Sequence, residues 1–170
     1  MLKKVWNIIT TLVVIVVVIL ACIMFLPKLF GITPMAVLSG SMEPTYHVGS
    51  LVFIKDTDPE TIKVGDPITF EIGSGSTVVT HRVIKVNTEE KTFETKGDNN
   101  DNTDGAGVAF SKVRGKAYDF SIPLLGYLAV YLGTTQGMII MVTTILVIII
   151  LSFLIDSLTK DRDKERGVAK

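Results

Sequence analysis

The sequence predicts a mainly β domain flanked by two transmembrane helices. Two long, uncharged apolar runs lie near the ends of the 170-residue chain. Between them, short runs rich in β-branched residues are separated by Gly, Asp and Asn turns. We expect four parts: an N-terminal transmembrane anchor (1–28), an extracytoplasmic β domain (29–135), a C-terminal transmembrane helix (136–157) and a charged cytoplasmic tail (158–170).

The first apolar run covers residues 5–26 and contains no charged side chain. About 20 apolar residues match the hydrocarbon thickness of a bilayer. A cleavable signal peptide is the alternative, because Lys3 and Lys4 give the run a basic start. The run is longer than the apolar core of about 7–15 residues in such peptides, and Pro27 ends it without a small-x-small cleavage site. We therefore expect an uncleaved anchor.

The second apolar run covers residues 138–155 and is also about one membrane thickness long. Basic residues flank both runs on their outer sides. Cytoplasmic flanks of membrane spans carry an excess of Lys and Arg, and acidic residues in the same flank do not count against this rule. Both termini are therefore expected in the cytoplasm and the middle segment outside it. The residues behind this orientation are Lys3, Lys4, Lys160, Arg162, Lys164, Arg166 and Lys170.

The overall charge excludes one function class and the cysteine content excludes one kind of cross-link. Seventeen basic and seventeen acidic residues give a formal net charge of zero, which argues against a nucleic-acid-binding protein. The single cysteine, Cys22, lies in the first apolar run and cannot form an internal disulfide. We interpret it as a small hydrophobic residue facing lipid.

The middle segment is predicted to fold into short strands. They are bounded by turn residues such as Gly49-Ser50 and Asp56 to Pro59, and residues 99–107 form a polar loop. The apolar stretch 122–131 is expected to pack at the membrane interface, with Tyr127 and Tyr131 at the level of the lipid headgroups. The expected strands are 51–54, 67–72, 78–86, 92–95 and 113–118.

Ser41 is the candidate nucleophile, in the sequence VLSGSMEP that follows an apolar run. A serine hydroxyl needs a base to take its proton, and the chain offers two histidines, His47 and His81. His81 lies inside a predicted strand and shares one face with Val79 and Val83, so its ring can be held in one orientation. His47 is interpreted as a solvated loop residue.

A carboxylate that orients the histidine is expected in the segment 98–104, which carries three acids. Asp and Asn side chains there can equally bond their own backbone as a turn. The alternating oxygens also resemble a Ca²⁺ loop. However, Thr103 stands where an EF-hand needs glycine and Ala109 where it needs glutamate, so we expect no metal site and no cofactor.

Five short motifs together resemble type I signal peptidase, peptidase family S26. The motifs follow the order and spacing of that family, and the resemblance covers about residues 33–135. His81 occupies the position where the common bacterial enzymes have a lysine, which makes the chain similar to the endoplasmic-reticulum and archaeal branch that also occurs in some Gram-positive bacteria. The motifs are SGSMEPT (39–45), GSLVFIK (49–55), GDPITF (65–70), THRVI (80–84) and TKGDNN (95–100).

The resemblance implies a role for each candidate residue. It makes Ser41 the nucleophile and His81 the general base, with Asp104 the first choice to orient His81 and Asp98 the second. Asp101 has no counterpart in the family and is expected to be solvated. Ser39 Oγ and the backbone N–H of Ser41 are the expected oxyanion donors. Substrate side chains are expected near Val37, Leu38 and Met42, for which core packing is an equal alternative.

The resemblance also implies a function. It predicts a membrane-bound serine endopeptidase that cuts signal peptides from exported pre-proteins after small residues at positions −1 and −3. Its partners would be those pre-proteins and the bilayer, and proximity to the secretion translocon is left open. Two alternatives remain: a protease limited to a few secreted proteins, and a non-catalytic, membrane-tethered β domain that binds a protein partner.

Overall fold

The computed structural model describes residues 2–73 and 77–168 of the chain. These residues form two compact units, one made of Met1–Ile23 with Tyr131–Lys170 and the other of Met24–Val130. Each unit is described by itself below. The finer division into four parts stays a prediction.

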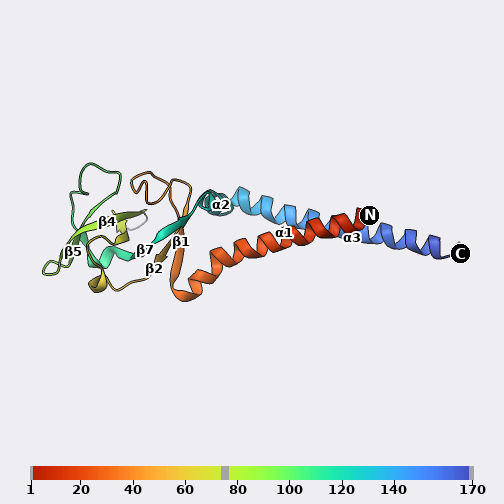
Figure 1. Ribbon diagram of the computed structural model, residues 1–170, viewed down its shortest axis with the longest axis horizontal. Coiled ribbons are helices and arrows are strands. Elements are labelled where there is room, and N and C mark those ends of the chain that lie inside the picture. The colour runs from red at the N-terminus through yellow and green to blue at the C-terminus, as the bar shows by residue number, and fades with distance from the viewer. Residues whose placement is uncertain (1, 74–76, 169–170) are drawn as a thin grey trace. The chain divides into compact units, whose positions relative to one another are not determined.

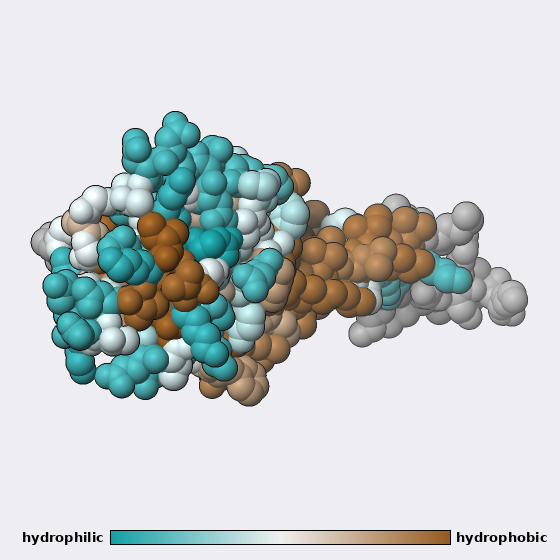
Figure 2. Space-filling model, turned by 60° about the vertical axis from the view of Figure 1, so that its left-hand side comes forward, coloured by the Kyte–Doolittle hydropathy of each residue, from teal (hydrophilic) through white to brown (hydrophobic). Residues whose placement is uncertain are grey.

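The first unit consists of two long helices, α1 (Leu2–Phe25) and α3 (Thr135–Val168). They lie alongside each other (Figure 1), and the indole Nε1 of Trp6 donates a hydrogen bond to Ser152 Oγ at 3.2 Å. Two stretches, Lys3–Phe30 and Thr135–Ile155, are long and apolar enough to cross a membrane by length and composition. Their apolar side chains are exposed over a continuous hydrophobic surface (Figure 2), as expected where lipid replaces water.

Helix α3 continues well beyond the apolar run that predicts it. Its backbone stays helical to Val168, because the segment after the run consists largely of Lys, Arg, Glu and Asp, and no glycine or proline interrupts it before Gly167. The predicted cytoplasmic tail is therefore helical over most of its length. The side chains of residues 158–170, including its basic residues, lie outside the described residues.

The second unit is built on one sheet, which confirms the mainly β fold class. Within the described residues the sheet has seven strands in the order β1-β2-β7-β3-β4-β5-β6. Every neighbouring pair is antiparallel. The strands are β1 (Ile32–Ala36), β2 (Leu51–Lys55), β3 (Pro67–Ile72), β4 (Thr77–Asn87), β5 (Thr92–Lys96), β6 (Val108–Ala109) and β7 (Val113–Ile122).

Five of these strands confirm the ranges predicted from the sequence, and two were missed. Strand β1 contains Pro34, which weakens the strand signal because proline cannot donate to a ladder. It is tolerated because β1 is an edge strand that, among the strands the structure describes, pairs only with β2. Strand β6 has two residues, too few for a recognisable alternation.

The last strand joins the two halves of the sheet. Strand β7 lies between β2 and β3, with Ala117 paired to Ile54 and Lys116 paired to Ile68. Gly115 makes this close approach feasible, since a Cβ there would lie 2.2 Å from the carbonyl oxygen of Lys55. The strands that flank the candidate nucleophile and those that carry the candidate base therefore meet only through β7.

Two apolar clusters stabilise the sheet from its two halves. The first contains Phe93, fully buried and stacked on Phe110 with ring centroids 4.4 Å apart. Burying one large side chain in this way contributes roughly 1.5–3 kcal/mol. The first cluster comprises Ile62, Ile68, Phe70, Val83, Phe93 and Val108, and the second Met42, Tyr46, Val52, Ile54 and Ala117.

A short helix, α2 (Leu125–Leu132), follows β7 where an apolar interfacial stretch was predicted. Gly126 packs directly against the segment before β2, because a Cβ there would lie 2.2 Å from the carbonyl oxygen of Ser50. Tyr127 and Tyr131 are 55% and 46% exposed, and their placement at the headgroups stays a prediction. Three single-turn 3₁₀ segments complete the described chain: Leu26–Phe30, Pro59–Thr61 and Phe110–Lys112.

Candidate active site

The loop that carries Ser41 follows edge strand β1 and is folded by its own backbone. The amide of Glu43 donates to the carbonyl of Gly40 at 3.1 Å, and the amide of Tyr46 donates to the carbonyl of Met42 at 2.9 Å. Ser41 is half-buried, Ser39 is exposed, and their hydroxyl oxygens lie 3.4 Å apart. The two serines therefore share one small polar patch.

His81 is held rigidly in the middle of β4. It pairs with Ile68 of β3, and the predicted alternation is present because Val83 is buried and Val79 half-buried on the same face. Only 8% of His81 is exposed, and its ring meets the ring of Phe70 edge-on with centroids 6.3 Å apart. Packing thus restricts the imidazole to one orientation.

Asp104 determines which nitrogen of the His81 ring carries the proton. Its Oδ2 lies 2.6 Å from His81 Nδ1 and also accepts a hydrogen bond from Thr95 Oγ1 at 2.5 Å. The amide of Asp104 donates to the carbonyl of Thr95 at 2.9 Å. With Nδ1 donating to the carboxylate, the neutral imidazole keeps its lone pair on Nε2, the arrangement that a general base needs.

Asp98, the second candidate to orient His81, binds elsewhere. Its carboxylate accepts from Arg82 Nε at 2.7 Å, from Arg82 Nη2 at 2.6 Å and from Thr45 Oγ1 at 2.6 Å. Partial burial alone would raise the pKa of Asp98, but the hydrogen bonds from Arg82 and Thr45 and the positive charge of Arg82 outweigh it and lower that pKa below its usual value. Asp98 thus stays ionised and connects the Ser41 loop to β4.

The Ser41 loop and the loop after β5 are joined at the backbone. The amide of Asn99 donates to the carbonyl of Ser41 at 2.8 Å. Gly97 allows this contact, because a Cβ at that position would lie 2.6 Å from the same carbonyl oxygen. Together with the bonds of Asp98, this contact holds the nucleophile's loop beside the strand of the candidate base.

Ser41 and His81 do not hydrogen-bond directly. Within the described residues, the hydroxyl of Ser41 has one hydrogen-bond partner, Ser39, and the ring of His81 has one, Asp104. Nucleophile–base contacts are often long without substrate and tighten in the complex, so this geometry is compatible with a catalytic pair.

A cleft of about 330 Å³ lies beside Ser41. Val37, Leu38 and Met42, the predicted substrate contacts, all line it. Met42 and Val37 also pack in the second apolar cluster, whereas Leu38 is 73% exposed. Val78, Val79 and Thr80, at the start of β4, also line it.

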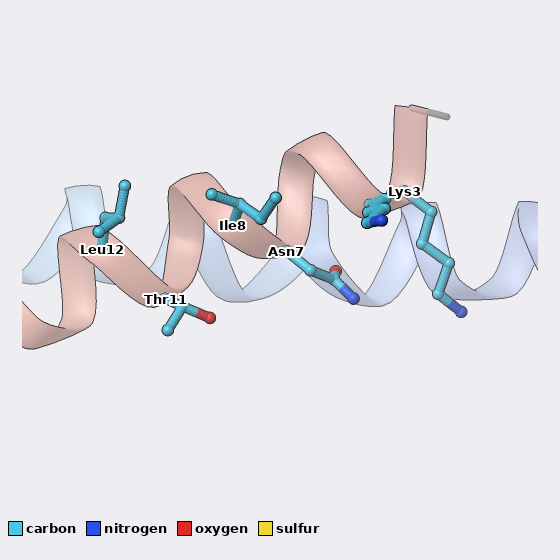
Figure 3. Close-up of a pocket in the computed structure, with 6 residues that line it drawn as sticks. Lys3, Asn7, Ile8, Thr11 and Leu12 are labelled. Carbon is cyan, nitrogen blue, oxygen red and sulfur yellow. The ribbon is translucent and has the colours of Figure 1, made fainter.

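Further hollows lie outside this cleft, among them two larger ones. One, of about 430 Å³, is lined by His81, Asp104, Phe70 and Val108. The other, of about 640 Å³, follows the surface of α1 between Lys3 and Leu12 (Figure 3) and contains no candidate catalytic residue. Within the described residues no group of three or more His, Cys, Asp or Glu side chains could hold a metal ion.

Several residues of the site were not predicted from the sequence. His47 and Asp101 are both exposed, as expected. His47 also has a partner that was not predicted, because its Nδ1 lies 2.5 Å from Glu43 Oε2 of the same loop. Thr95 and Arg82, which hold the two aspartates, had no assigned role. Thr95 lies in the motif TKGDNN with Asp98, and Arg82 lies in the motif THRVI with His81. Membership of these motifs was the sequence signal that could have identified both residues.

Comparison with known proteins agrees with this arrangement. The family described as signal peptidase, peptidase S26, matches residues 8–99. Signal peptidase I W of Bacillus subtilis (strain 168) is 42% identical over 100 residues, which are 57% of this chain and 52% of that protein. The human signal peptidase complex catalytic subunit SEC11C is 41% identical over 68 residues, 38% of this chain and 35% of that protein.

The chain thus spans about half the length of the first of these curated relatives and about a third of the second. The family match covers more than half of the chain, from α1 through Ser41 and His81 to the loop that carries Asp98. The match to the SEC11C subunit agrees with the branch predicted from His81 in the sequence. The chain belongs to the signal peptidase family, peptidase S26, in its endoplasmic-reticulum-like branch.

Proposed function

We propose that this chain is a membrane-bound serine endopeptidase that removes N-terminal signal peptides from exported proteins. Ser41 is the nucleophile, His81 the general base and Asp104 the group that orients His81. One observation carries the proposal: a buried, strand-mounted imidazole binds a carboxylate through Nδ1, and its strand lines the cleft that holds Ser41. The names of the relatives support the same substrate class.

The chemistry follows from these roles. Ser41 attacks the scissile carbonyl carbon while His81 Nε2 takes the hydroxyl proton, and Asp104 stabilises the imidazolium that forms. His81 then protonates the leaving amine, which departs with the mature protein and leaves the signal peptide as an ester on Ser41. Water, deprotonated by His81, hydrolyses the ester and restores the enzyme.

Negative charge develops on the carbonyl oxygen during both steps. The backbone N–H of Ser41 and the hydroxyl of Ser39 are the proposed donors to it. The proximity of the two serine hydroxyls, 3.4 Å apart, supports this role, because an oxygen bonded to the carbon attacked by Ser41 comes within reach of Ser39. Such a donor in a dry site typically lowers the barrier by about 3–4 kcal/mol.

The substrate binds as an extended strand beside β4. Residues 77–81 of β4 pair with β3 on one edge, whereas pairing with β5 begins only at Arg82, so the other edge is open toward the cleft. Main-chain hydrogen bonds along such an edge place alternate side chains in pockets. Val37, Leu38 and Met42 leave room there for small residues at −1 and −3.

The two apolar helices anchor the enzyme in the bilayer with both chain ends in the cytoplasm and the β unit outside. The basic residues outside the two spans support this orientation. Pre-proteins that carry a signal sequence are the partners, and their apolar segment lies in the same bilayer. Anchoring raises their local concentration without any new contact. Proximity to the secretion translocon is part of the same proposal and rests on the family resemblance.

Cleavage of a pre-protein by the detergent-purified full chain tests the proposal. Ser41→Ala should abolish cleavage, and His81→Ala and Asp104→Asn should come close to abolishing it. Ser111→Ala replaces an exposed serine outside the site and His47→Ala the other histidine, and both should retain cleavage.

The identity of the products adds a second reading. Sequencing the mature product should place the cut after small residues at −1 and −3. Undiminished cleavage by Ser41→Ala would reject the nucleophile, and loss of cleavage in His47→Ala but not in His81→Ala would reassign the base.

A further inference from the structure

The carboxylate of Asp104 is held by a residue to which no role has been assigned. Thr95, in β5, is 1% exposed, and its hydroxyl donates to Asp104 Oδ2 at 2.5 Å. The same oxygen lies 2.6 Å from His81 Nδ1. The carbonyl of Thr95 also accepts the amide of Asp104 at 2.9 Å. Thr95 therefore forms hydrogen bonds with both the side chain and the backbone of Asp104.

These two hydrogen bonds matter because Asp104 itself does not belong to a strand. It lies in the loop between β5 and β6, and its carboxylate could turn about its side-chain bonds without a fixed partner. Thr95 belongs to the sheet and pairs with Val83, two residues from His81 on the same face of β4. A β-branched side chain on a strand has few rotamers, so its hydroxyl position is well defined.

We propose that Thr95 is a positioning residue: its hydroxyl fixes the carboxylate of Asp104 so that His81 presents Nε2 to Ser41. This inference rests on the proposed function, because it assigns Thr95 a part in the same reaction. Thr95 is not among the residues that line the cleft beside Ser41, so it acts through Asp104 and not through the substrate.

A purely structural role for this hydroxyl is the alternative. A second buried threonine, Thr69, donates to or accepts from Thr80 Oγ1 at 2.7 Å in the same sheet, which shows that buried hydroxyls also occur here simply as paired groups. The two roles differ in what a substitution changes. Loss of a paired hydroxyl lowers stability, whereas loss of a positioning hydroxyl lowers kcat in an enzyme that stays folded.

Two substitutions at position 95 separate shape from hydrogen bonding. Thr95→Val keeps the shape and removes the hydroxyl, and Thr95→Ser keeps the hydroxyl and removes the methyl group. With the detergent-purified full chain and a pre-protein substrate, Thr95→Val should lower kcat by about 10- to 100-fold with KM unchanged, because misplacing a reacting group has effects of this order. Thr95→Ser should retain kcat within about threefold of wild type, since its hydrogen bond to Asp104 is kept.

A spectroscopic measurement reports on the same contact directly. The proton on His81 Nδ1, hydrogen-bonded to Asp104, gives a low-field NMR resonance that His81→Ala identifies by its absence. This resonance should shift or broaden in Thr95→Val and persist in Thr95→Ser. Thermal unfolding of each variant establishes that it is folded, and Thr95→Cys, with its weak donor, replaces the valine variant if that one does not fold.

Three results would overturn the inference: wild-type kcat in Thr95→Val, an equal loss of kcat in the serine and valine variants, or an unchanged resonance in Thr95→Val. Ser41→Ala separates this inference from the proposed function. If Ser41→Ala still cleaves, the proposed function fails. If Ser41→Ala is inactive while Thr95→Val cleaves like wild type, only the role of Thr95 fails.

Discussion

At the scale of single residues, the site depends on side chains whose orientation is set by their neighbours. The ring of His81 has one hydrogen-bond partner within the described residues, Asp104, whose carboxylate also accepts a hydrogen bond from Thr95. Asp98 has Arg82 and Thr45 instead. The two aspartates, six positions apart, thus do different work: one faces the imidazole and the other holds the loop of the nucleophile.

Ser39→Ala should reduce kcat on the order of 10²-fold and leave the fold intact, because it removes one donor to the developing oxyanion. Ser39 is exposed, and within the described residues its hydroxyl contacts only Ser41, so the substitution leaves no buried group unpaired. Steady-state cleavage of a pre-protein measures the effect, with thermal unfolding as the check on folding. A loss of less than threefold would exclude Ser39 as a donor.

The residue scale also shows the limits of the sequence. Alternation along the strand correctly predicted the inward face of His81, because period-two patterning depends on the strand alone. It could not rank Asp104 above Asp98, since that choice depends on how a loop folds back on β4 and β5. The role of Thr95 was not predicted for the same reason, because its partner Asp104 is nine positions away and lies in a loop.

At the scale of elements, the position of Ser41, the proposed nucleophile, depends on a contact between two loops. The carbonyl of Ser41 accepts from Asn99, and Gly97 leaves just enough room for that approach. The five strands recognised from the sequence have strong alternation or β-branched runs. Strand β1, which leads into the Ser41 loop, was missed because its proline suits an edge strand and its partner lies in a distant part of the chain.

Gly97→Ala should impair cleavage without unfolding the β unit. The added Cβ would lie 2.6 Å from the Ser41 carbonyl oxygen, so the Ser41 loop must shift, and a displacement of about 1 Å can reduce the rate on the order of 10²-fold. Gly107→Ala is the matched control, because its Cβ would meet Thr92 at an ordinary 3.5 Å. Equal kcat/KM for the two variants would show that the loop contact is unimportant.

At the scale of the whole molecule, the two apolar spans and their basic flanks were evident from composition and confirm the predicted flanking helices. Length and hydropathy alone suffice for such helices because the bilayer imposes a simple requirement on them. The helical continuation of the charged tail was not predicted, because the apolar pattern that located the span ends before it.

The orientation of the spans yields a prediction that labelling can check. In a Cys22→Ser background, a cysteine at the exposed position Thr88 should react with a membrane-impermeant maleimide in intact cells. An epitope attached after Lys170 should resist external protease until the membrane is permeabilised. Labelling of Thr88→Cys only after permeabilisation would place the β unit in the cytoplasm and contradict the proposed function.

Strand β7 has a consequence for the timing of synthesis. Ser41, His81 and Asp104 are all synthesised before residues 113–122. In the described sheet β2 and β3, the strands on either side of β7, are not paired with each other. A nascent chain that still lacks this strand therefore has no strand between the part of the sheet next to Ser41 and the part that carries His81, although the loop bonds of Asn99 and Asp98 can still link the two. Under the proposed function we therefore expect a chain truncated before residue 113 not to cleave a pre-protein, because it lacks the strand that joins the two parts of the sheet.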